Sequence, residues 1–551
     1  MYLRGRIRIG VALGLVLSGT LAPRGAAAQS YGASVALGDF DQSGGWTRDD
    51  IAVGAPTDDW GAVGAGSVTI WWKTDASTKV NWIDQGRLGG GFFWGGQDGG
   101  QESFDGFGYS LATGDFDHDG FRDLVIGAPW EDVAGAGDAG CVHVLYGAAD
   151  GSGPDGIPFR SETTFLTRAN AYGHPIPAWP EASDNFGYAL VAGDFDGDGH
   201  DDLAVGAPGA TVNGQQGAGA VFVFYNTGFH NPGEGFDSSF EYTLVQGGFY
   251  SPAGVAEAWD NFGAALAAGN FNGDLHPTTF PGTGPNGVPV VEDLAVGAPG
   301  QVFGSEPNVG NVTIYYGRSN LEFDTANNAV IEPSSLGPAG AFENFGASLA
   351  AGDFDANCST NSAWTCPLYT DLAIGAPTGP AGGVAFAGKV HVLYSTSGGV
   401  GLDGAQLWTS ASFGLENAVG AGFGSSLATG DVIGEPNAGC QGNACNPVEL
   451  VIGEPNRSNG DGVMYILAGA SLAPLSTNHA FIYRSGSSPG SSSRFGAALA
   501  VGQAGHYSGQ SPSIWNAGDI LTGMPGTNNV LLNFGDASSI NTERRSFGWP
   551  W

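Results

Sequence analysis

Four aspartates within nine residues are the strongest chemical feature of this sequence. In the stretch FGYSLATGDFDHDGFRDLVIGAP, residues 107–129, they stand at relative positions 1, 3, 5 and 9: Asp115, Asp117, Asp119 and Asp123. Gly120 follows the third aspartate, where a tight reversal needs a residue that can take positive φ. Carboxylates this close repel one another unless a cation lies among them, and hard oxygen ligands suit Ca²⁺. The loop therefore predicts a calcium site.

A second copy of this stretch, residues 186–208, is nearly identical and carries Asp194, Asp196, Asp198 and Asp202. An EF-hand loop also begins with Asp-x-Asp-x-Asp-Gly, but it needs a bidentate glutamate at position 12 and flanking helices. Position 12 is Ile126 in one copy and Val205 in the other, each inside a run typical of a β-strand. The EF-hand is therefore excluded. For any single loop the alternative is an Asp/Gly hairpin turn without metal.

Five further copies of the loop keep fewer of these aspartates. Three of them remain candidates: Asp39, Asp41 and Asp50 in the first unit, Asn270, Asn272, Asp274 and Asp293 in the fourth, and Asp353, Asp355, Asn357 and Asp371 in the fifth. The fourth has the lower charge, so its ion should bind more weakly. The sixth copy, which begins at Asp431, has lost its second ligand, and the seventh, which begins at Gln503, is expected to be metal-free.

The ends of the stretch recur as well. A Phe-Gly pair, or a Tyr-Gly variant, occurs seven times, with its glycine at Gly32, Gly108, Gly187, Gly263, Gly346, Gly424 and Gly496. Each pair is followed by a Gly-x-Pro end: Gly54–Pro56, Gly127–Pro129, Gly206–Pro208, Gly297–Pro299, Gly375–Pro377, Gly453–Pro455 and Gly523–Pro525. Successive pairs lie between 72 residues (Gly424 to Gly496) and 83 residues (Gly263 to Gly346) apart. Units of this size predict a radial or stacked array rather than independent domains.

Four short strands are expected in each unit. The first, such as SLATGDF at 110–116, is rich in alanine and glycine, which suits an innermost strand where neighbouring units converge. The second follows the aspartate loop, the third is a run such as CVHVLYG at 141–147, and a fourth is visible in most units. Four strands separated by turn residues predict a propeller blade. In the last unit the fourth strand must come from the tail, residues 539–551, or be missing.

Composition limits the partners and the compartment. The 551 residues include 18 Lys and Arg against 54 Asp and Glu, which gives a formal charge of −36. This balance argues against nucleic acid or anionic lipid as the main partner, because both are negatively charged and bind positively charged protein surfaces. Only 13% of residues are charged and 96 are glycine, a profile that favours a β-rich exported protein.

Residues 1–28 have the pattern of an export signal peptide. Arginines at positions 4, 6 and 8 form a basic start, residues 9–21 are apolar, and three alanines at 26–28 offer a cleavage site before Gln29. A retained membrane anchor is the alternative, although the apolar run is short for a span. We therefore expect a mature protein without a membrane span that is secreted, at the cell surface or in a periplasm.

Five cysteines fit an oxidising compartment. Cys358 and Cys366 lie in one insert, and Cys440 and Cys445 lie in another, so each pair is expected to close its own loop as a disulfide. A zinc site is the alternative for such pairs. Cys141, inside the strand-like run at 141–147, is expected to be a buried free thiol.

The Phe-Gly and Gly-Ala-Pro ends around Asp-x-Asp-x-Asp-Gly-x-x-Asp resemble the FG-GAP repeats of integrin α-subunit propellers, from Tyr31 to at least Pro525. The resemblance implies an all-β fold, a single seven-bladed β-propeller over residues 29–551 with blades that start near residues 31, 107, 186, 262, 345, 423 and 495. It also implies structural Ca²⁺ in the hairpins between first and second strands. The Phe121 and His200 carbonyls are then expected as main-chain ligands in the second and third units.

No catalytic motif stands out. The sequence contains no Gly-x-Ser-x-Gly elbow, His-Glu-x-x-His pair, phosphate loop or dinucleotide fingerprint. His143 and His391 occupy the same third-strand position in two units, which favours a packed structural role.

The loops just before the Phe-Gly pairs share a second pattern, Glu-x-x-Asp, at 102–105, 181–184 and 257–260. Its repetition favours capping turns. Nearby tryptophans that do not repeat are better ligand candidates, with the filling of grooves between blades as the alternative: Trp60, Trp94, Trp130, Trp179 and Trp259. We therefore expect an adhesion or recognition module for an extracellular protein or glycan. The alternatives are an extracellular polysaccharide lyase or hydrolase on the same propeller, and a purely architectural component.

Overall fold

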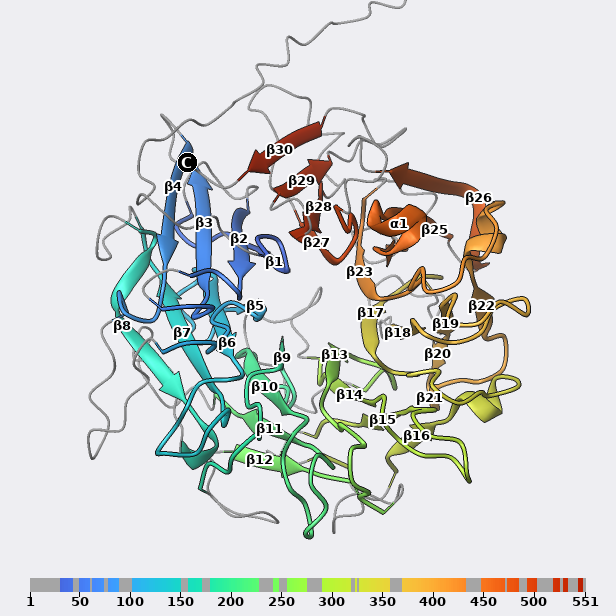
Figure 1. The fold of residues 1–551 in the computed structure, drawn as a ribbon, viewed down its shortest axis with the longest axis horizontal. Coiled ribbons are helices and arrows are strands. Elements are labelled where there is room, and N and C mark those ends of the chain that lie inside the picture. Colours follow the sequence, from blue (N-terminus) through green and yellow to red (C-terminus); the bar gives the residue numbers. More distant parts are fainter. Residues whose placement is uncertain are drawn as a thin grey trace, which may run out of the picture.

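Seven four-stranded antiparallel sheets stand in sequence order around a common centre in the computed structural model (Figure 1). The seven-bladed β-propeller predicted from the repeats is therefore confirmed. The structure describes residues 30–42, 49–59, 62–73, 78–88, 102–149, 157–170, 179–226, 241–246, 255–274, 290–318, 323–324, 327–356, 369–432, 447–470, 473–484, 493–502, 519–525, 529–533 and 544–548.

Each of the first four blades consists of four consecutive strands. Blade 1 has β1 (Ser34–Gly38), β2 (Asp50–Ala55), β3 (Ser67–Lys73) and β4 (Thr78–Ile83). Blade 2 has β5 (Ser110–Gly114), β6 (Asp123–Ala128), β7 (Cys141–Gly147) and β8 (Phe159–Leu166). Blade 3 has β9 (Ala189–Gly193), β10 (Asp202–Ala207), β11 (Ala220–Phe224) and β12 (Glu241–Leu244). Blade 4 has β13 (Ala265–Gly269), β14 (Asp293–Ala298), β15 (Asn311–Tyr315) and β16 (Ala329–Ile331).

The last three blades repeat this order with small additions. Blade 5 has β17 (Ser348–Gly352), β18 (Asp371–Ala376), β19 (Lys389–Leu393) and β22 (Gln406–Trp408), with the short hairpin β20 (Ser395–Thr396) and β21 (Gly399–Val400) inserted. Blade 6 has β23 (Ser426–Gly430), β24 (Glu449–Glu454), β25 (Val463–Ala470) and β26 (Ala473–Arg484). Blade 7 has β27 (Ala498–Gly502), β28 (Asp519–Met524), β29 (Asn529–Asn533) and β30 (Arg544–Gly548). The described helices are single turns: η3 (Arg168–Asn170), η4 (Pro333–Ser335), η5 (Ser410–Phe413) and α1 (Arg457–Gly460).

The first strand of each blade lies innermost. β5 is flanked by β1 on one side and β9 on the other, and the same neighbour relation continues around the ring. These strands consist largely of alanine, glycine, serine and leucine, as in SLATG of β5 and ALVAG of β9. Small side chains allow seven strands to converge, because little room remains near the axis.

The two glycines of the repeat signature meet where neighbouring blades come closest. A Cβ atom added to Gly127, in β6, would lie 2.2 Å from the carbonyl oxygen of Gly187, which belongs to the Phe-Gly pair of the next blade. The same approach recurs at every interface, including the last, where a Cβ on Gly523 would lie 2.0 Å from the carbonyl oxygen of Gly32. A larger residue cannot fit there without moving a blade. The two ends of the signature are therefore the two halves of one contact between blades.

A serine hydroxyl reinforces this contact at several interfaces. Ser110 Oγ donates a 2.6 Å hydrogen bond to the carbonyl of Gly187, which lies in the next blade. Three other serines make the equivalent bond at 2.6 Å: Ser34, Ser348 and Ser426. Ala189 and Ala265 occupy the same position in blades 3 and 4, so the bond adds to the contact without being required for it.

The apolar core is distributed over the interfaces between blades. The Phe107 ring is fully buried, and its main-chain N–H donates to the Ala65 carbonyl of the preceding blade at 2.9 Å. Around this ring, one cluster joins Val68 and Ile70 of blade 1 to Leu124 of blade 2. Equivalent clusters join the other neighbouring blades.

The ring closes between blades 7 and 1 without exchange of a strand. β27 lies beside β1, and one apolar cluster joins Val53 of blade 1 to Leu521 and Val530 of blade 7. In Figure 1 these first and last blades, blue and red, are neighbours in the ring. β30 pairs with β29. Of the two alternatives for the tail, the structure therefore shows the fourth strand of the last blade.

Some predictions fall outside the described residues. These are the signal peptide at 1–28 and the two cysteine pairs, Cys358 with Cys366 and Cys440 with Cys445, so they stay predictions. Cys141 is buried and free, as predicted. Within the described ranges, no helix has the length and apolarity needed to cross a membrane.

Candidate metal centres

Among the residues that the structure describes, four aspartate clusters lie in the hairpins that join first and second strands. In each, three carboxylates offer one oxygen apiece, and the three oxygens all lie within 4.8 Å of one another: Asp39, Asp41 and Asp50; Asp115, Asp117 and Asp123; Asp194, Asp196 and Asp202; Asp353, Asp355 and Asp371. Because Ca²⁺–oxygen distances are about 2.3–2.6 Å, ligands on opposite sides of one ion lie about 5 Å apart. The spacing of these oxygens therefore fits one Ca²⁺ in each hairpin.

The last aspartate of the hairpin has a second role that the sequence did not reveal. The two carboxylate oxygens of Asp123 accept the main-chain N–H groups of Phe116 at 2.7 Å and Gly147 at 2.8 Å. This residue thereby ties the hairpin to the end of β7. Three others make the same pair of bonds: Asp202, Asp293 and Asp371. Burial, and next the charge of Asp117, raises the pKa of Asp123 well above its usual value.

Arg160 enters the second hairpin from β8. Its guanidinium bonds Asp117 and Asp119, the latter at 2.8 Å, and lies 5.5 Å from the centre of the Tyr146 ring. Arg160 therefore contacts Asp117, one of the three clustered carboxylates, as well as Asp119, which lies outside the cluster. Asp119 stays a predicted ligand. Sequence reasoning missed Arg160, because its fourth-strand position has no fixed spacing from the loop.

In the third hairpin the partner of the third aspartate is a histidine instead. Asp198 Oδ1 lies 3.0 Å from both the main-chain nitrogen and Nδ1 of His200. Burial, followed by the charges of Asp196 and Asp198, raises the pKa of Asp194 to about 8. Burial also raises the pKa values of Asp196 and Asp202. Charges crowded in a poorly hydrated place resist ionisation, and a bound divalent cation reverses that effect.

The first and fifth hairpins also gather three carboxylates. Burial, and next the charge of Asp41, raises the pKa of Asp39 to about 6. Burial likewise raises the pKa of Asp371 to about 8. The predicted ligand Asn357 lies outside the described residues.

The fourth hairpin is different, because asparagines already bond its aspartate. Asn272 Nδ2 donates to Asp274 Oδ2 at 3.0 Å, and Asn270 Nδ2 donates to the main-chain carbonyl of Asp274 at 2.9 Å. Asp293 keeps its main-chain role, with Phe271 N at 2.7 Å. A side-chain amide thus bonds the carboxylate of Asp274 in this hairpin. The weaker metal binding expected here stays a prediction.

The main-chain role of the last acidic residue extends to the sixth hairpin, for which no metal is predicted. Val432 N donates to Glu449 Oε2 at 2.6 Å. The hairpin thus keeps its closing acid where it has lost its second candidate ligand. The carbonyls of Phe121 and His200 stay predictions as ligands.

Comparison with known proteins agrees with the repeats. The FG-GAP repeat family matches residues 107–145 and 186–224, the second and third units. The chain is an FG-GAP β-propeller. It is 31% identical over 272 residues to integrin alpha-PS2 of Drosophila melanogaster, which covers 48% of this chain and 15% of that protein. It is 32% identical over 209 residues to phosphatidylinositol-glycan-specific phospholipase D of Rattus norvegicus, which covers 38% and 20%. Integrin alpha-5 of Xenopus laevis is 31% identical over 196 residues, 35% of this chain and 15% of that one.

The other end of this FG-GAP propeller carries the Phe-Gly turns, and we call it the Phe-Gly face. The predicted capping turns lie here: the carboxylates of Asp105, Asp184 and Asp260 accept the main-chain N–H three residues earlier at 2.5, 2.8 and 2.7 Å. The structural role expected for Glu-x-x-Asp is therefore confirmed.

Buried charges lie between blades just below these turns. Three of the acids are paired with a cation: Asp184 with Arg168 at 2.7 Å, Glu343 with Lys389, and Glu454 with Arg457 at 2.9 Å. The interface between blades 1 and 2 instead holds two acids side by side. Burial, and next the charge of Asp105, raises the pKa of Glu131 to about 9, and the neutral Gln85 donates to Glu131 Oε2 at 2.6 Å. Burial and the neighbouring Asp105 therefore favour the protonated form of Glu131.

The histidines and tryptophans separate into packed and exposed groups. Burial lowers the pKa values of His143 and His391 to about 4, and their rings pack against Phe107 and Phe345, which confirms their structural role. Trp130 packs edge-to-face on Tyr109, with ring centres 4.8 Å apart. Two others are exposed, Trp179 by 74% and Trp259 by 59%. Trp60 and Trp94 lie outside the described residues.

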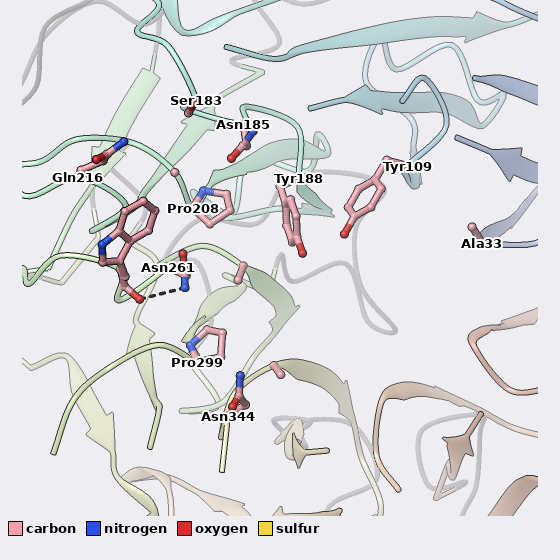
Figure 2. Close-up of a pocket in the computed structure, with 14 residues that line it drawn as sticks. Ala33, Tyr109, Ser183, Asn185, Tyr188, Pro208, Gln216, Asn261, Pro299 and Asn344 are labelled. Carbon is pink, nitrogen blue, oxygen red and sulfur yellow. Dashed lines mark hydrogen bonds between the residues drawn. The ribbon is translucent and has the colours of Figure 1, made fainter. Parts of the chain in front are cut away.

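A cavity of about 720 Å³ opens on the Phe-Gly face beside the axis (Figure 2). Its lining includes Tyr109, Tyr188, Gln216 and Trp259, and blades 1 to 5 all contribute. Sequence analysis singled out Trp259 but neither tyrosine. The tyrosines could have been found by comparing the residue after each Phe-Gly pair across the units.

Proposed function

We propose that this FG-GAP propeller is an exported, Ca²⁺-stabilised recognition module that binds an extracellular protein or glycan through its Phe-Gly face. The calcium part depends on one observation, the gathering of three aspartate oxygens within 4.8 Å in each of four hairpins. Such oxygen-only sets suit a hard cation of this size.

The carboxylates of the first, second, third and fifth hairpins would hold the ion, which supplies positive charge among them. The chain's own contribution is to fix those carboxylates. Asp202, for example, is held by the N–H groups of Phe195 at 2.9 Å and Asn226 at 2.8 Å, from the hairpin and the end of β11. An ion bound beside it would therefore brace the innermost hairpin against the third strand.

The recognition part is supported by the separation of the two faces and by the relatives. The acidic hairpins lie at one end of the innermost strands, around a cavity of about 820 Å³ whose lining is charged. Exposed aromatic side chains and the uncharged cavity of about 720 Å³ lie at the other end. The related proteins are named integrin alpha and phosphatidylinositol-glycan-specific phospholipase D. Export is supported by the signal-peptide pattern of residues 1–28.

The test uses the purified mature chain, with and without a chelator. Equilibrium dialysis with ⁴⁵Ca²⁺ should give saturable binding, and an array of glycans and extracellular-matrix proteins should show a saturable ligand. Failure to bind Ca²⁺ would refute the first part, and failure to bind any ligand would refute the second. Turnover of a polysaccharide that is lost when Phe-Gly-face carboxylates are replaced would instead identify an enzyme.

A further inference from the structure

The repeat is broken beside the axis on the Phe-Gly face. The residue after each Phe-Gly glycine is small in five blades and tyrosine in the other two: Ala33, Tyr109, Tyr188, Ala264, Ala347, Ser425 and Ala497. Since five blades close their turns without a large side chain here, the fold does not require Tyr109 and Tyr188. Tyrosine in blades 2 and 3 is followed by alanine in blades 4 and 5, which leaves a hollow beside the two aromatic side chains.

The two tyrosines form one aromatic wall of this hollow. Their ring centres lie 4.9 Å apart with the planes tilted by 47°, and Figure 2 shows them side by side. Trp130 also packs on Tyr109, with ring centres 4.8 Å apart. The wall is therefore held in place before any ligand arrives, which lowers the entropic cost of binding.

Trp259 adds an exposed ring from the loop just before the Phe-Gly turn of blade 4. Its backbone has φ of 71°, a left-handed conformation that bulky residues rarely adopt. A Cβ on Gly217 would lie 2.7 Å from the indole, so the glycine allows the ring to rest on the neighbouring blade. The equivalent residues Phe104, Ser183 and Phe342 share this conformation, so the repeated turn sets the backbone from which the exposed indole projects.

Side-chain amides surround these rings. Asn185, Asn261 and Asn344 line the cavity from equivalent turns, with φ of 55°, 55° and 53°. Main-chain carbonyls orient two of them: Asn261 Nδ2 donates to Trp259 O at 3.0 Å, drawn in Figure 2, and Asn185 Nδ2 donates to Pro129 O at 3.2 Å. Gln216 adds a fourth carboxamide. Each carboxamide offers both donors and acceptors.

None of the described lining residues is charged, although the chain carries a net charge of −36. A lining without charge gives an ionic ligand no partner, and the acidic chain repels anions. Aromatic faces together with amides match a pyranose, whose C–H face packs on a ring while its hydroxyls exchange hydrogen bonds with amides. A volume of about 720 Å³ is in the range of small-ligand sites.

We propose that this cavity binds a neutral pyranose-containing glycan, with Tyr188 and Trp259 as the rings that contact the sugar. The proposal rests on the recognition function above and names its ligand class and its site. It excludes sialylated, sulfated and uronic-acid glycans as preferred ligands.

The experiment compares binding of purified, Ca²⁺-loaded mature protein to neutral oligosaccharides of glucose, galactose, mannose and N-acetylglucosamine with binding to their sulfated and sialylated counterparts. Trp259→Ala and Tyr188→Ala should each weaken binding of the best neutral glycan about tenfold or more in isothermal titration, as expected for central aromatic contacts. Trp179→Ala is the matched control, since this tryptophan is 74% exposed and does not line the cavity. Each variant is used only if its melting temperature matches that of the wild type.

Neutral-glycan binding that both cavity variants weaken and the control retains supports the proposal. A preference for charged glycans, or neutral-glycan binding that the cavity variants leave intact, overturns it while the recognition function stands. Binding of a protein ligand alone has the same meaning. Should Tyr188→Ala fail to fold, Tyr188→Phe together with quenching of Trp259 fluorescence by the bound sugar provides the second measurement.

Discussion

Replacement of Asp196 by asparagine tests whether the third aspartate cluster binds a cation or only forms the hydrogen bonds of a hairpin turn. Asp196 is 5% exposed and accepts the Asp198 N–H at 3.1 Å, a bond that an asparagine carbonyl can keep. The substitution removes one negative charge from the cluster and changes little in shape. A metal site and a simple turn therefore respond to it in opposite ways.

The expected magnitude follows from binding linkage. At a free Ca²⁺ concentration one hundred times the dissociation constant, one site stabilises the folded state by about 2.7 kcal/mol. Asp196→Asn should lose most of that stabilisation in Ca²⁺. In chelator it should be neutral or slightly stabilising, because the remaining carboxylates repel one another less. Melting temperature and bound ⁴⁵Ca²⁺ are measured in both conditions, and about one equivalent of calcium should be lost.

The second hairpin supplies a matched contrast. Asp117 is bonded by Arg160, so Asp117→Asn weakens a charged hydrogen bond worth about 1.5–3 kcal/mol and should destabilise the protein even in chelator. Equal destabilisation of Asp196→Asn with and without Ca²⁺, or unchanged calcium stoichiometry, would refute the reasoning about the third hairpin.

Three further predictions concern the contacts between blades. Gly127→Ala should destabilise the folded state by about 1–3 kcal/mol or more and so lower the melting temperature, because its Cβ would lie 2.2 Å from the Gly187 carbonyl oxygen. Gly137→Ala is the control, since its Cβ would lie 3.5 Å from Asp132 Oδ1, and equal effects would contradict the steric account. Ser110→Ala removes the 2.6 Å bond to the same carbonyl and should cost about 1 kcal/mol in thermal unfolding, with no cost as the contrary result. Glu131 has its pKa raised from 4.5 to about 9 by burial and a neighbouring carboxylate, so its contribution is fully present below pH 4.5 and is lost as pH rises through about 9. Glu131→Gln should therefore gain stability relative to wild type as pH rises over that window, by at most about 1.4 kcal/mol per pH unit, and parallel pH profiles would contradict this.

The fold could be predicted from the sequence because its signature residues are the contact residues. Phe107 and Gly108 mark an interface between blades, and Gly127 marks the next one. Because each blade repeats these contact residues, their recurrence in the sequence indicates the number and the order of the blades. The aspartate hairpins were equally readable, since their ligands lie within one short loop.

Contacts between residues far apart in the sequence could not be predicted in this way. Arg160 reaches the second hairpin from another strand, and Tyr188 matters only because the equivalent positions in blades 4 and 5 are alanine. The bonds of Asp123 to two main-chain N–H groups depend on where β7 ends. The partners of Arg160 and Asp123 leave no local pattern of residue types, because tertiary structure alone brings them together. Tyr188 can be recognised only when the equivalent positions of all units are compared.

The junction between the last blade and the first allows the order of the blades along the chain to be changed. Every blade is formed by strands that follow one another in the chain. At most one segment of chain therefore connects two neighbouring blades at each of the seven junctions. A gene that starts at the second blade and ends with the first, its old termini joined by a short linker, would keep every sheet intact. Circular permutation should therefore be tolerated at any of these junctions, which makes the propeller a ring without a privileged starting point.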